Sequence, residues 1–158
     1  MLCRGCLESP IGNILITADE NAVHQISFIN VIPDGFELNA NTWTEAAKDQ
    51  LSLYFAGKLK QFDLPLLSGL TEFQNLVLEE VKKIPYGQTV TYSQLAKRMG
   101  SLKLTRAVAA ANASNPNLIV IPCHRVIGKN NDLTGYAGEL WRKKWLLRHE
   151  NAIIPLLP

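Results

Sequence analysis

The sequence predicts an α+β fold, in which a small antiparallel sheet with one helix precedes a mostly helical region with a winged-helix-like helix-turn-helix. Within the first 29 of its 158 residues, short apolar segments alternate with turn sequences, as in an antiparallel meander. Beyond residue 42, apolar residues recur at spacings of three and four, which indicates helices. Charge also divides the chain: residues 1–81 contain 4 Lys and Arg against 11 Asp and Glu, and residues 82–158 contain 12 against 3. These observations predict two domains.

The predicted N-terminal domain spans residues 1–68. Its strands are expected at residues 2–7, 14–17 and 23–29, and a polar loop at 30–42. Residues 43–55 form an amphipathic pattern, and Gly57 is placed to end that helix. Residues 58–70, which contain Pro65, Ser68 and Gly69, are the best candidate for a linker.

The predicted C-terminal domain spans residues 69–158. Thr71 and Gln74 have the spacing of a capping box at the start of a helix. Further helices are expected at residues 92–100, at 105–113 with Thr105 as N-cap, and at 139–149. Residues 119–121 are β-branched and predict a buried strand that ends at Pro122. Residues 128–138 predict a loop.

The helices at residues 92–100 and 105–113 are joined by a short turn that contains Gly100, as in a helix-turn-helix. The second helix is rich in alanine, and alanine is also simply the best helix former. An alanine surface, however, lets a helix approach a narrow groove closely. Together with the basic charge of this half, the pattern favours contact with DNA.

Cys123, His124 and Arg125 follow Pro122 directly. A thiol is a good nucleophile only as the thiolate, which a neighbouring base or cation favours. Taken alone, the tripeptide favours the alternative of an inert buried cysteine, because free cysteines are commonly buried. Adjacent side chains of a strand point to opposite faces, so contact between Cys123 and His124 requires a turn or a bridging water.

A histidine that acts as a base needs an acid to orient it. The chain after His124 offers only Asp132, Glu139 and Glu150. Glu150 follows the predicted last helix, where the helix dipole disfavours an acid, so its placement indicates a functional role.

Cys3 and Cys6 form half of a zinc motif, with His24 as a conceivable third ligand, but no second pair follows at the usual spacing. We therefore expect ordinary thiols and no metal. An odd number of free cysteines suits a reducing compartment. The N-terminus lacks the apolar core of a secretory signal, and no apolar run is long enough to cross a membrane.

These motifs together resemble the O6-alkylguanine-DNA alkyltransferases, also called methylated-DNA–protein-cysteine methyltransferases. The resemblance is strong over residues 71–150 and looser over the first 68. The matching residues are Pro122 to Val126, Asn115-Pro116, Arg106-Ala107-Val108, Ile84 to Gly87, Thr91-Tyr92, Gln94-Leu95-Ala96 and Leu146-Leu147, with Ser9 to Gly12 and Leu53 to Gly57 in the first part. The resemblance implies a ribonuclease-H-like first domain.

The resemblance also implies single-turnover repair without a cofactor. Cys123 would take the alkyl group from O6-alkylguanine that is flipped out of duplex DNA, a step needed because the target atom is inaccessible within the stack. His124 and Glu150 would remove the thiol proton, Tyr136 would protonate the leaving guanine, and Asn115 would hold the cysteine segment.

Arg106 would fill the space left by the flipped base and Tyr92 would press on the adjacent phosphate. Ala107, Ala110 and Arg125 would also contact DNA, and Val126, Tyr136 and Ala137 would line the substrate pocket.

We accordingly expect a monomer that acts on duplex DNA in the cytoplasm, at the nucleoid, with no membrane partner. Ala137 departs from the Ser of many relatives, Ala109 from Gly, and Leu78 from Trp. A Ser hydroxyl would add one neutral hydrogen bond, and losing such a bond costs about 1 kcal/mol, so Ala137 should reduce or alter activity without abolishing it.

Three alternative functions are a DNA-binding relative without catalysis, a transcriptional regulator and a cysteine hydrolase. Cys123 argues against the first, a helix with few polar residues against the second, and the helix-turn-helix against the third.

Overall fold

The computed structural model describes residues 1–31, 37–67, 69–133 and 135–152. The chain forms two compact units. The N-terminal unit comprises residues 1–69 and 116–118, and the C-terminal unit residues 70–115 and 119–158. The predicted domain boundary at Ser68 and part of the predicted loop at residues 30–42 lie outside the described residues. No helix in the described ranges is long and apolar enough to cross a membrane.

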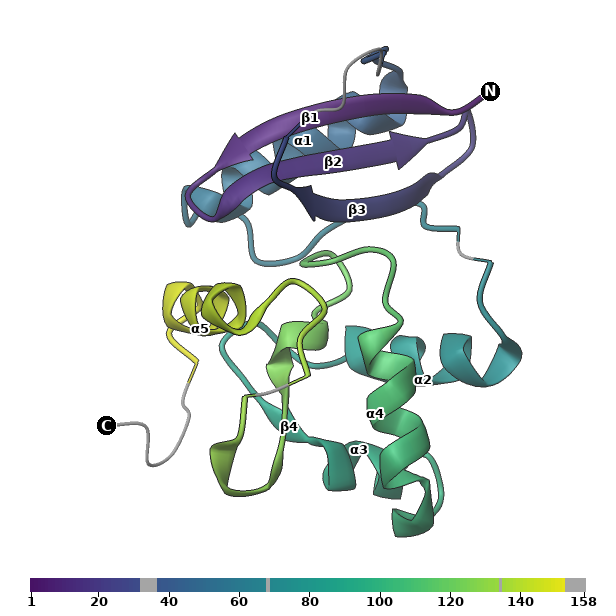
Figure 1. Ribbon diagram of the computed structural model, residues 1–158, viewed down its shortest axis with the longest axis vertical. Coiled ribbons are helices and arrows are strands. Elements are labelled where there is room, and N and C mark those ends of the chain that lie inside the picture. The colour runs from purple at the N-terminus through teal and green to yellow at the C-terminus, as the bar shows by residue number, and fades with distance from the viewer. Residues whose placement is uncertain (32–36, 68, 134, 153–158) are drawn as a thin grey trace. The chain divides into compact units, whose positions relative to one another are not determined.

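The N-terminal unit is an antiparallel sheet with a helix packed against it, as predicted (Figure 1). The strands β1 (Cys3–Ser9), β2 (Gly12–Ala18) and β3 (Val23–Ile29) pair in sequence order. The helix α1 (Thr42–Phe55) begins with a capping box made by Asn41 and Thr44. Its apolar face and that of the sheet are fully buried, which gives this unit its own core; examples are Ile14, Ile16, Ala47 and Leu51.

The free edge of β3 binds a segment from much later in the chain. The Ile26 amide donates to the Pro116 carbonyl at 2.9 Å, and the Leu118 amide donates to the Ile26 carbonyl at 3.1 Å. These bonds form a parallel bridge at Asn117. The residues that directly precede the Cys123 segment therefore belong to the N-terminal sheet.

The C-terminal unit is mostly helical. Its helices are α2 (Glu72–Lys82), α3 (Tyr92–Arg98), α4 (Thr105–Ala113) and α5 (Leu140–His149), with 3-10 turns η1 (Leu102–Leu104), η2 (Cys123–Arg125) and η3 (Lys129–Asn131). Two short strands, β4 (Val90–Thr91) and β5 (Val126–Ile127), pair in parallel. The predicted capping box of Thr71 and Gln74 is confirmed. The helix pair α3–α4, with α2 packed against both, forms the helix-turn-helix.

Two local predictions are wrong. Thr105 is not an N-cap, because the chain is already turning through η1, and its hydroxyl donates to the Leu102 carbonyl at 2.6 Å. Residues 119–121 do not form a strand, because the ladder to β3 ends at Leu118 and the chain then turns. Ile119 has a φ of 72°, a left-handed conformation that is strained for a β-branched residue.

Candidate active site

Cys123 lies in a tight turn rather than at the end of a strand. Pro122 has φ −81° and ψ 60°, the geometry of an inverse γ-turn, and the Cys123 amide donates to the Ile121 carbonyl at 2.8 Å. The 3-10 turn η2 follows at once, with the Arg125 amide donating to the Pro122 carbonyl at 2.9 Å. Cys123 and His124 are therefore not on opposite faces of a strand, so the sequence-based obstacle to their cooperation is removed.

The C-terminal end of α4 anchors this turn through two amide side chains. The Asn115 Nδ2 donates to the Ile121 carbonyl at 2.8 Å, and the Asn112 Nδ2 donates to the Cys123 carbonyl at 3.2 Å. Both side chains are buried. The sequence indicated Asn115 as a holding residue, whereas Asn112 was missed because it looks like one more residue of an alanine-rich helix.

His124, Glu150 and Arg125 form a buried network. The His124 Nε2 lies 2.7 Å from the Glu150 Oε2, and both side chains are fully buried. The Arg125 guanidinium donates to both Glu150 oxygens at 2.8 and 3.1 Å and to the Ile84 carbonyl at 2.7 Å. Arg125 is thus buried and engaged inside the C-terminal unit, a placement that does not suit the DNA contact expected of it.

The network determines which nitrogen of His124 can accept a proton. Burial alone would raise the pKa of Glu150, but the hydrogen bonds and charges of His124 and Arg125 hold it well below its usual range. A carboxylate only accepts hydrogen bonds, so the His124 Nε2 carries the proton and Nδ1 keeps its lone pair. Burial lowers the pKa of His124, which leaves the imidazole neutral at pH 7. Among the described residues, the buried Nδ1 has no hydrogen-bond partner.

The thiol itself is protonated at rest. Cys123 is 2% exposed, and burial raises the pKa of its thiol to about 11, although the Asn115 side chain and the charge of Lys143 act in the opposite direction. A protonated thiol is a poor nucleophile. A reaction at this sulfur therefore requires that the thiol proton be removed first.

Two tyrosines lie near the cysteine. Tyr136 is 9% exposed, its ring centroid is 6.5 Å from that of His124, and its buried hydroxyl lacks a hydrogen-bond partner among the described residues. Burial raises the pKa of Tyr136, so its hydroxyl stays protonated at neutral pH. Tyr92 starts α3, and its hydroxyl lies 3.2 Å from where a Cβ on Gly135 would be. With a φ of 93°, Gly135 suits this close approach. Ala137 is exposed in the same loop.

Lys143 is a functional candidate that sequence reasoning missed. Its side chain is fully buried, and its Nζ donates to the Val126 carbonyl at 2.7 Å. In the sequence it stands between Arg142 and Lys144, and such a run of basic residues is typical of a solvent-exposed face. A signal was available, because Lys143 shares one helical face with Leu146, Leu147 and Glu150 at spacings of three, four and seven.

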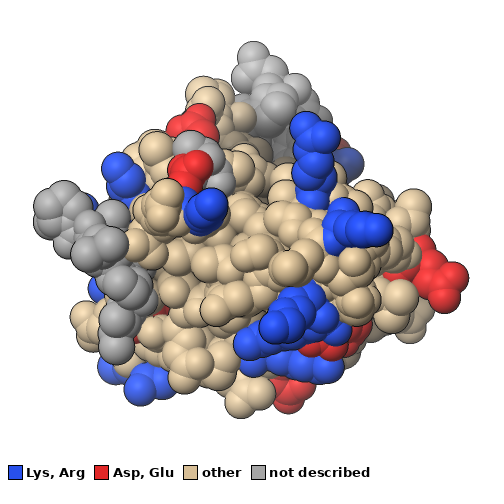
Figure 2. Space-filling view, turned by 90° about the horizontal axis from the view of Figure 1, so that it is seen from below, with Lys and Arg blue, Asp and Glu red and all other residues tan. Residues whose placement is uncertain are grey.

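The face of α4 that carries the expected DNA contacts is exposed. Arg106, Ala107 and Ala110 are exposed, whereas Val108 and Ala111 are buried. Between Glu80 and Asp132 the sequence contains no acidic residue. Figure 2 views the molecule from the end where α3 lies in Figure 1, and it shows a largely uncharged area with Lys and Arg side chains, and also some Asp and Glu, around it. Small residues beside scattered cations suit a polyanion that must approach closely.

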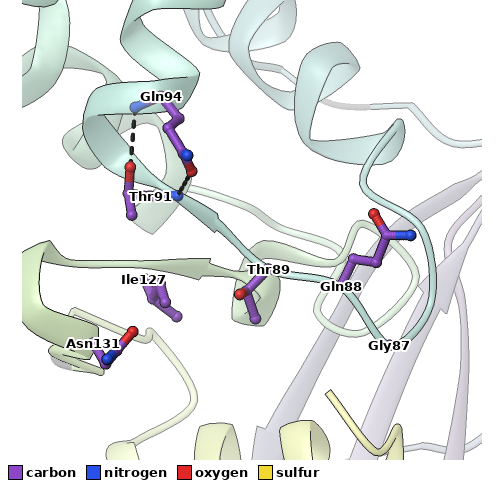
Figure 3. Close-up of a pocket in the computed structure, with 7 residues that line it drawn as sticks. All are labelled: Gly87, Gln88, Thr89, Thr91, Gln94, Ile127 and Asn131. Atoms are coloured by element: carbon purple, nitrogen blue, oxygen red, sulfur yellow. Dashed lines mark hydrogen bonds between the residues drawn. The ribbon is translucent and has the colours of Figure 1, made fainter. Parts of the chain in front are cut away.

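A pocket of about 390 Å³ borders β4 and β5 (Figure 3). It is lined by Gly87, Gln88, Thr89, Thr91, Gln94, Ile127 and Asn131. Figure 3 shows that Thr91 and Gln94 bond each other, as a capping box, with distances of 2.8 and 3.1 Å. The lining contains no nucleophile and no charged side chain, so we assign the chemistry to the Cys123 turn.

The cysteines of β1 do not form a metal site in the described part of the chain. Cys3 and Cys6 are three residues apart on a strand, which places them on opposite faces. The Nε2 of His24 lies 2.7 Å from an Asp19 carboxylate oxygen. No cluster of three metal-ligating side chains occurs among the described residues.

The fold and the site define a DNA-binding protein that carries a buried cysteine with a histidine–glutamate pair. Two family models match the chain: "6-O-methylguanine DNA methyltransferase, ribonuclease-like domain" at residues 2–67 and "6-O-methylguanine DNA methyltransferase, DNA binding domain" at 72–152. The chain belongs to this family of methylated-DNA–protein-cysteine methyltransferases, as its sequence suggested.

Relatives and solved structures agree over nearly the whole chain. The methylated-DNA–protein-cysteine methyltransferase of Methanosarcina acetivorans is 46% identical over an alignment of 150 residues, with coverages of 92% of this chain and 96% of that protein. The crystal structure of Mycobacterium tuberculosis O6-methylguanine methyltransferase has a TM-score of 0.84 and 34% identity, covering 99% of this chain and 96% of that one. A Mycobacterium tuberculosis structure in complex with DNA has a TM-score of 0.83 and 36% identity, with coverages of 92% and 91%.

Proposed function

We propose that this protein repairs O6-alkylguanine in duplex DNA by transferring the alkyl group irreversibly to Cys123. The observation that carries the proposal is the buried His124–Glu150 pair directly beside the cysteine. Family membership and a DNA-bound structural relative support DNA as the partner. O4-alkylthymine would be a second substrate only if the pocket admits a pyrimidine.

The chemical step is a displacement at the alkyl carbon. A water bridges Cys123 to the His124 Nδ1, which takes the thiol proton while Glu150 stabilises the resulting imidazolium. The sulfur forms a bond to the alkyl carbon as the bond from that carbon to O6 breaks, and the electron pair passes to the guanine. Tyr136 protonates the guanine and is reprotonated from His124, so the net transfer is one alkyl group and one proton. A thioether is a poor leaving group, so each molecule acts once.

DNA recognition involves α4 and the start of α3. The exposed alanines Ala107 and Ala110 allow close approach, Arg106 occupies the gap left by the flipped base, and Tyr92 acts on the neighbouring phosphate. The Val126 and Ala137 backbones and the Tyr136 side chain line the pocket for the extruded guanine. Asn115 and Arg125 do not touch DNA: Asn115 holds the turn and Arg125 holds Glu150.

We further propose that residues 1–68 are a scaffold and residues 69–158 the catalytic and DNA-binding domain. The protein acts as a monomer, since one chain supplies every group of the mechanism. Its substrate places it at the nucleoid.

Mass spectrometry of the protein mixed with a duplex that carries O6-methylguanine tests the proposal. One methyl group, about 14 Da, should appear on the Cys123 peptide with a stoichiometry of one, and the lesion should disappear in equal amount. The Cys123→Ala variant, and wild-type protein with undamaged duplex, are the controls. An unmodified Cys123 beside a persisting lesion would refute the proposal, and so would methylation confined to Cys3 or Cys6.

A further inference from the structure

Arg142 is a buried cation that the mechanism above does not use. It lies in the first turn of α5, and its side chain is only 9% exposed, whereas Trp141 directly before it is exposed. Burying a charged side chain is costly unless hydrogen bonds and other contacts compensate it. The contacts of Arg142 therefore indicate the purpose of its placement.

The described contacts of Arg142 connect α5 with the turn that carries Tyr136. The Arg142 Nη1 donates to the Gly138 carbonyl at 3.2 Å and lies 3.8 Å from the Glu139 Oε2. The guanidinium carbon lies 4.7 Å from the centre of the Trp141 ring, and the Trp141 Nε1 donates to the Glu139 Oε2 at 2.9 Å. Glu139, Trp141 and Arg142 form a cluster, here called the loop clamp, that fastens the turn to the helix.

The backbone of this turn needs such a restraint. The Glu139 amide donates to the Tyr136 carbonyl at 3.2 Å, which closes the turn. Gly135 before it and Glu139 at its end have left-handed φ values of 93° and 79°. Glycine adopts this conformation freely, but a residue with a side chain does so only where the surrounding structure holds it. The loop clamp supplies that hold at Glu139.

The position of the Tyr136 phenol depends on the turn. Its buried hydroxyl has no hydrogen-bond partner among the described residues, so none of these groups orients it directly. The charge of Arg142 opposes the rise that burial causes in the pKa of Tyr136, so the guanidinium also acts on the phenol electrostatically. Restraint of the turn and a nearby positive charge both favour a hydroxyl that gives up its proton at one fixed place.

We propose that Arg142 is a positioning residue, which holds Tyr136 through the loop clamp where its hydroxyl protonates the departing guanine. This inference rests on the proposed function, in which Tyr136 is the proton donor. Arg142 neither contacts the substrate nor exchanges a proton. The balance of the displacement is therefore unchanged: a proton still passes from Tyr136 to the guanine and from His124 to Tyr136.

A double-mutant cycle with Tyr136 tests this role. Single-turnover transfer from a saturating duplex that carries O6-methylguanine gives the rate constant of the chemical step. In Arg142→Met this constant should fall about tenfold, because the proton donor is misplaced. In the Tyr136→Phe background, which has no proton donor, the same change should alter the rate less than twofold. A further tenfold loss in that background would overturn the role of Arg142, and so would a wild-type rate in Arg142→Met or in Tyr136→Phe.

Iodoacetamide provides a reaction at the same sulfur that needs no proton donor, because iodide leaves without being protonated. Its rate at Cys123, followed by peptide mass spectrometry, should stay within twofold of wild type in Arg142→Met. An equal loss with iodoacetamide and with O6-methylguanine would show that Arg142 acts on the thiol or on the fold, and would overturn the proposed positioning of Tyr136.

Arg148→Met is the matched control, because Arg148 is an exposed arginine on the same helix, and it should match wild type. Circular dichroism and urea unfolding identify the folded variants. Arg142→Gln, which keeps a polar side chain but no charge, takes the place of Arg142→Met if that variant does not fold. Failure of the proposed function is distinguishable, since the wild-type protein would then transfer no methyl group from DNA.

Discussion

The residues around Cys123 suppress its reactivity at rest and supply the means to restore it. Burial keeps the thiol protonated, which protects a reagent that is used once from other electrophiles. In the proposed mechanism the His124 Nδ1 accepts that proton, and the hydrogen bonds and charges of His124 and Arg125 keep Glu150 ionised. The reactivity therefore depends on a chain of partners in which each orients the next.

Replacing the carboxylate in that chain should impair both chemistry and stability. In Glu150→Gln the amide can donate as well as accept, so the His124 tautomer is no longer determined and Arg125 loses its buried counter-charge. Loss of general-base catalysis should slow alkyl transfer about 100-fold or more. Breaking a buried pair should lower the free energy of unfolding by about 3 kcal/mol. Single-turnover kinetics and urea unfolding measure the two effects.

Glu79→Gln is the control for Glu150→Gln. Glu79 is exposed on α2 and pairs with Lys82 at 2.8 Å, an arrangement worth at most about 0.5 kcal/mol. It should match wild type in rate and stability. A Glu150→Gln variant that repairs at the wild-type rate would rule out the carboxylate as the group that orients His124.

Among the elements, α4 has two roles that its short sequence combines. In the proposed function its exposed face offers Arg106 and small residues to DNA. Asn112 near its C-terminal end and Asn115 just beyond it hold the cysteine turn. One face of the helix is exposed and carries small residues, and the other packs against α2 and α3. A displacement of α4 by bound DNA would consequently reach the nucleophile through two hydrogen bonds.

Arg106→Ala separates base extrusion from the chemistry. Arg106 is exposed at the start of α4, so removing it should leave the fold intact. Repair of the lesion in duplex DNA should fall about tenfold or more, whereas reaction with free O6-alkylguanine should stay within twofold of wild type, because a free base needs no flipping. Arg98→Ala, which removes an exposed cation of α3, is the control. Equal losses on both substrates would show that Arg106 does not act in flipping.

At the scale of the whole molecule, the chain does not divide into its two units at a single point. The basic charge of residues 82–158 is concentrated in the C-terminal unit, but Pro116–Leu118 leaves that unit to bind the edge of β3. The N-terminal sheet therefore holds one end of the segment that carries Cys123. Ile119, which has a left-handed backbone, is the first residue after this segment.

The charge distribution predicts a salt-dependent affinity for DNA. Lys and Arg that contact phosphates release counterions, so the logarithm of the association constant should fall linearly with the logarithm of salt concentration. Each phosphate contact contributes a slope of about −0.9. Fluorescence anisotropy on undamaged duplex between about 50 and 300 mM salt measures it. Reversing an exposed cation of the C-terminal unit, as in Lys103→Glu, should flatten the slope, while Lys58→Glu in the N-terminal unit should not; an affinity independent of salt would contradict a phosphate-based interface.

The sequence by itself determined the α+β class, most helix positions and the family, and it predicted Cys123, His124 and Glu150 as site residues, because these depend on periodicity and on short local motifs. It could not predict that Arg125 turns inward to Glu150, that Lys143 is buried or that Pro116–Leu118 joins the first sheet. Those outcomes bring together residues far apart in the chain. Only the packed structure decides whether a cation faces solvent or a buried partner, because that choice depends on the desolvation cost and on the groups available to compensate it.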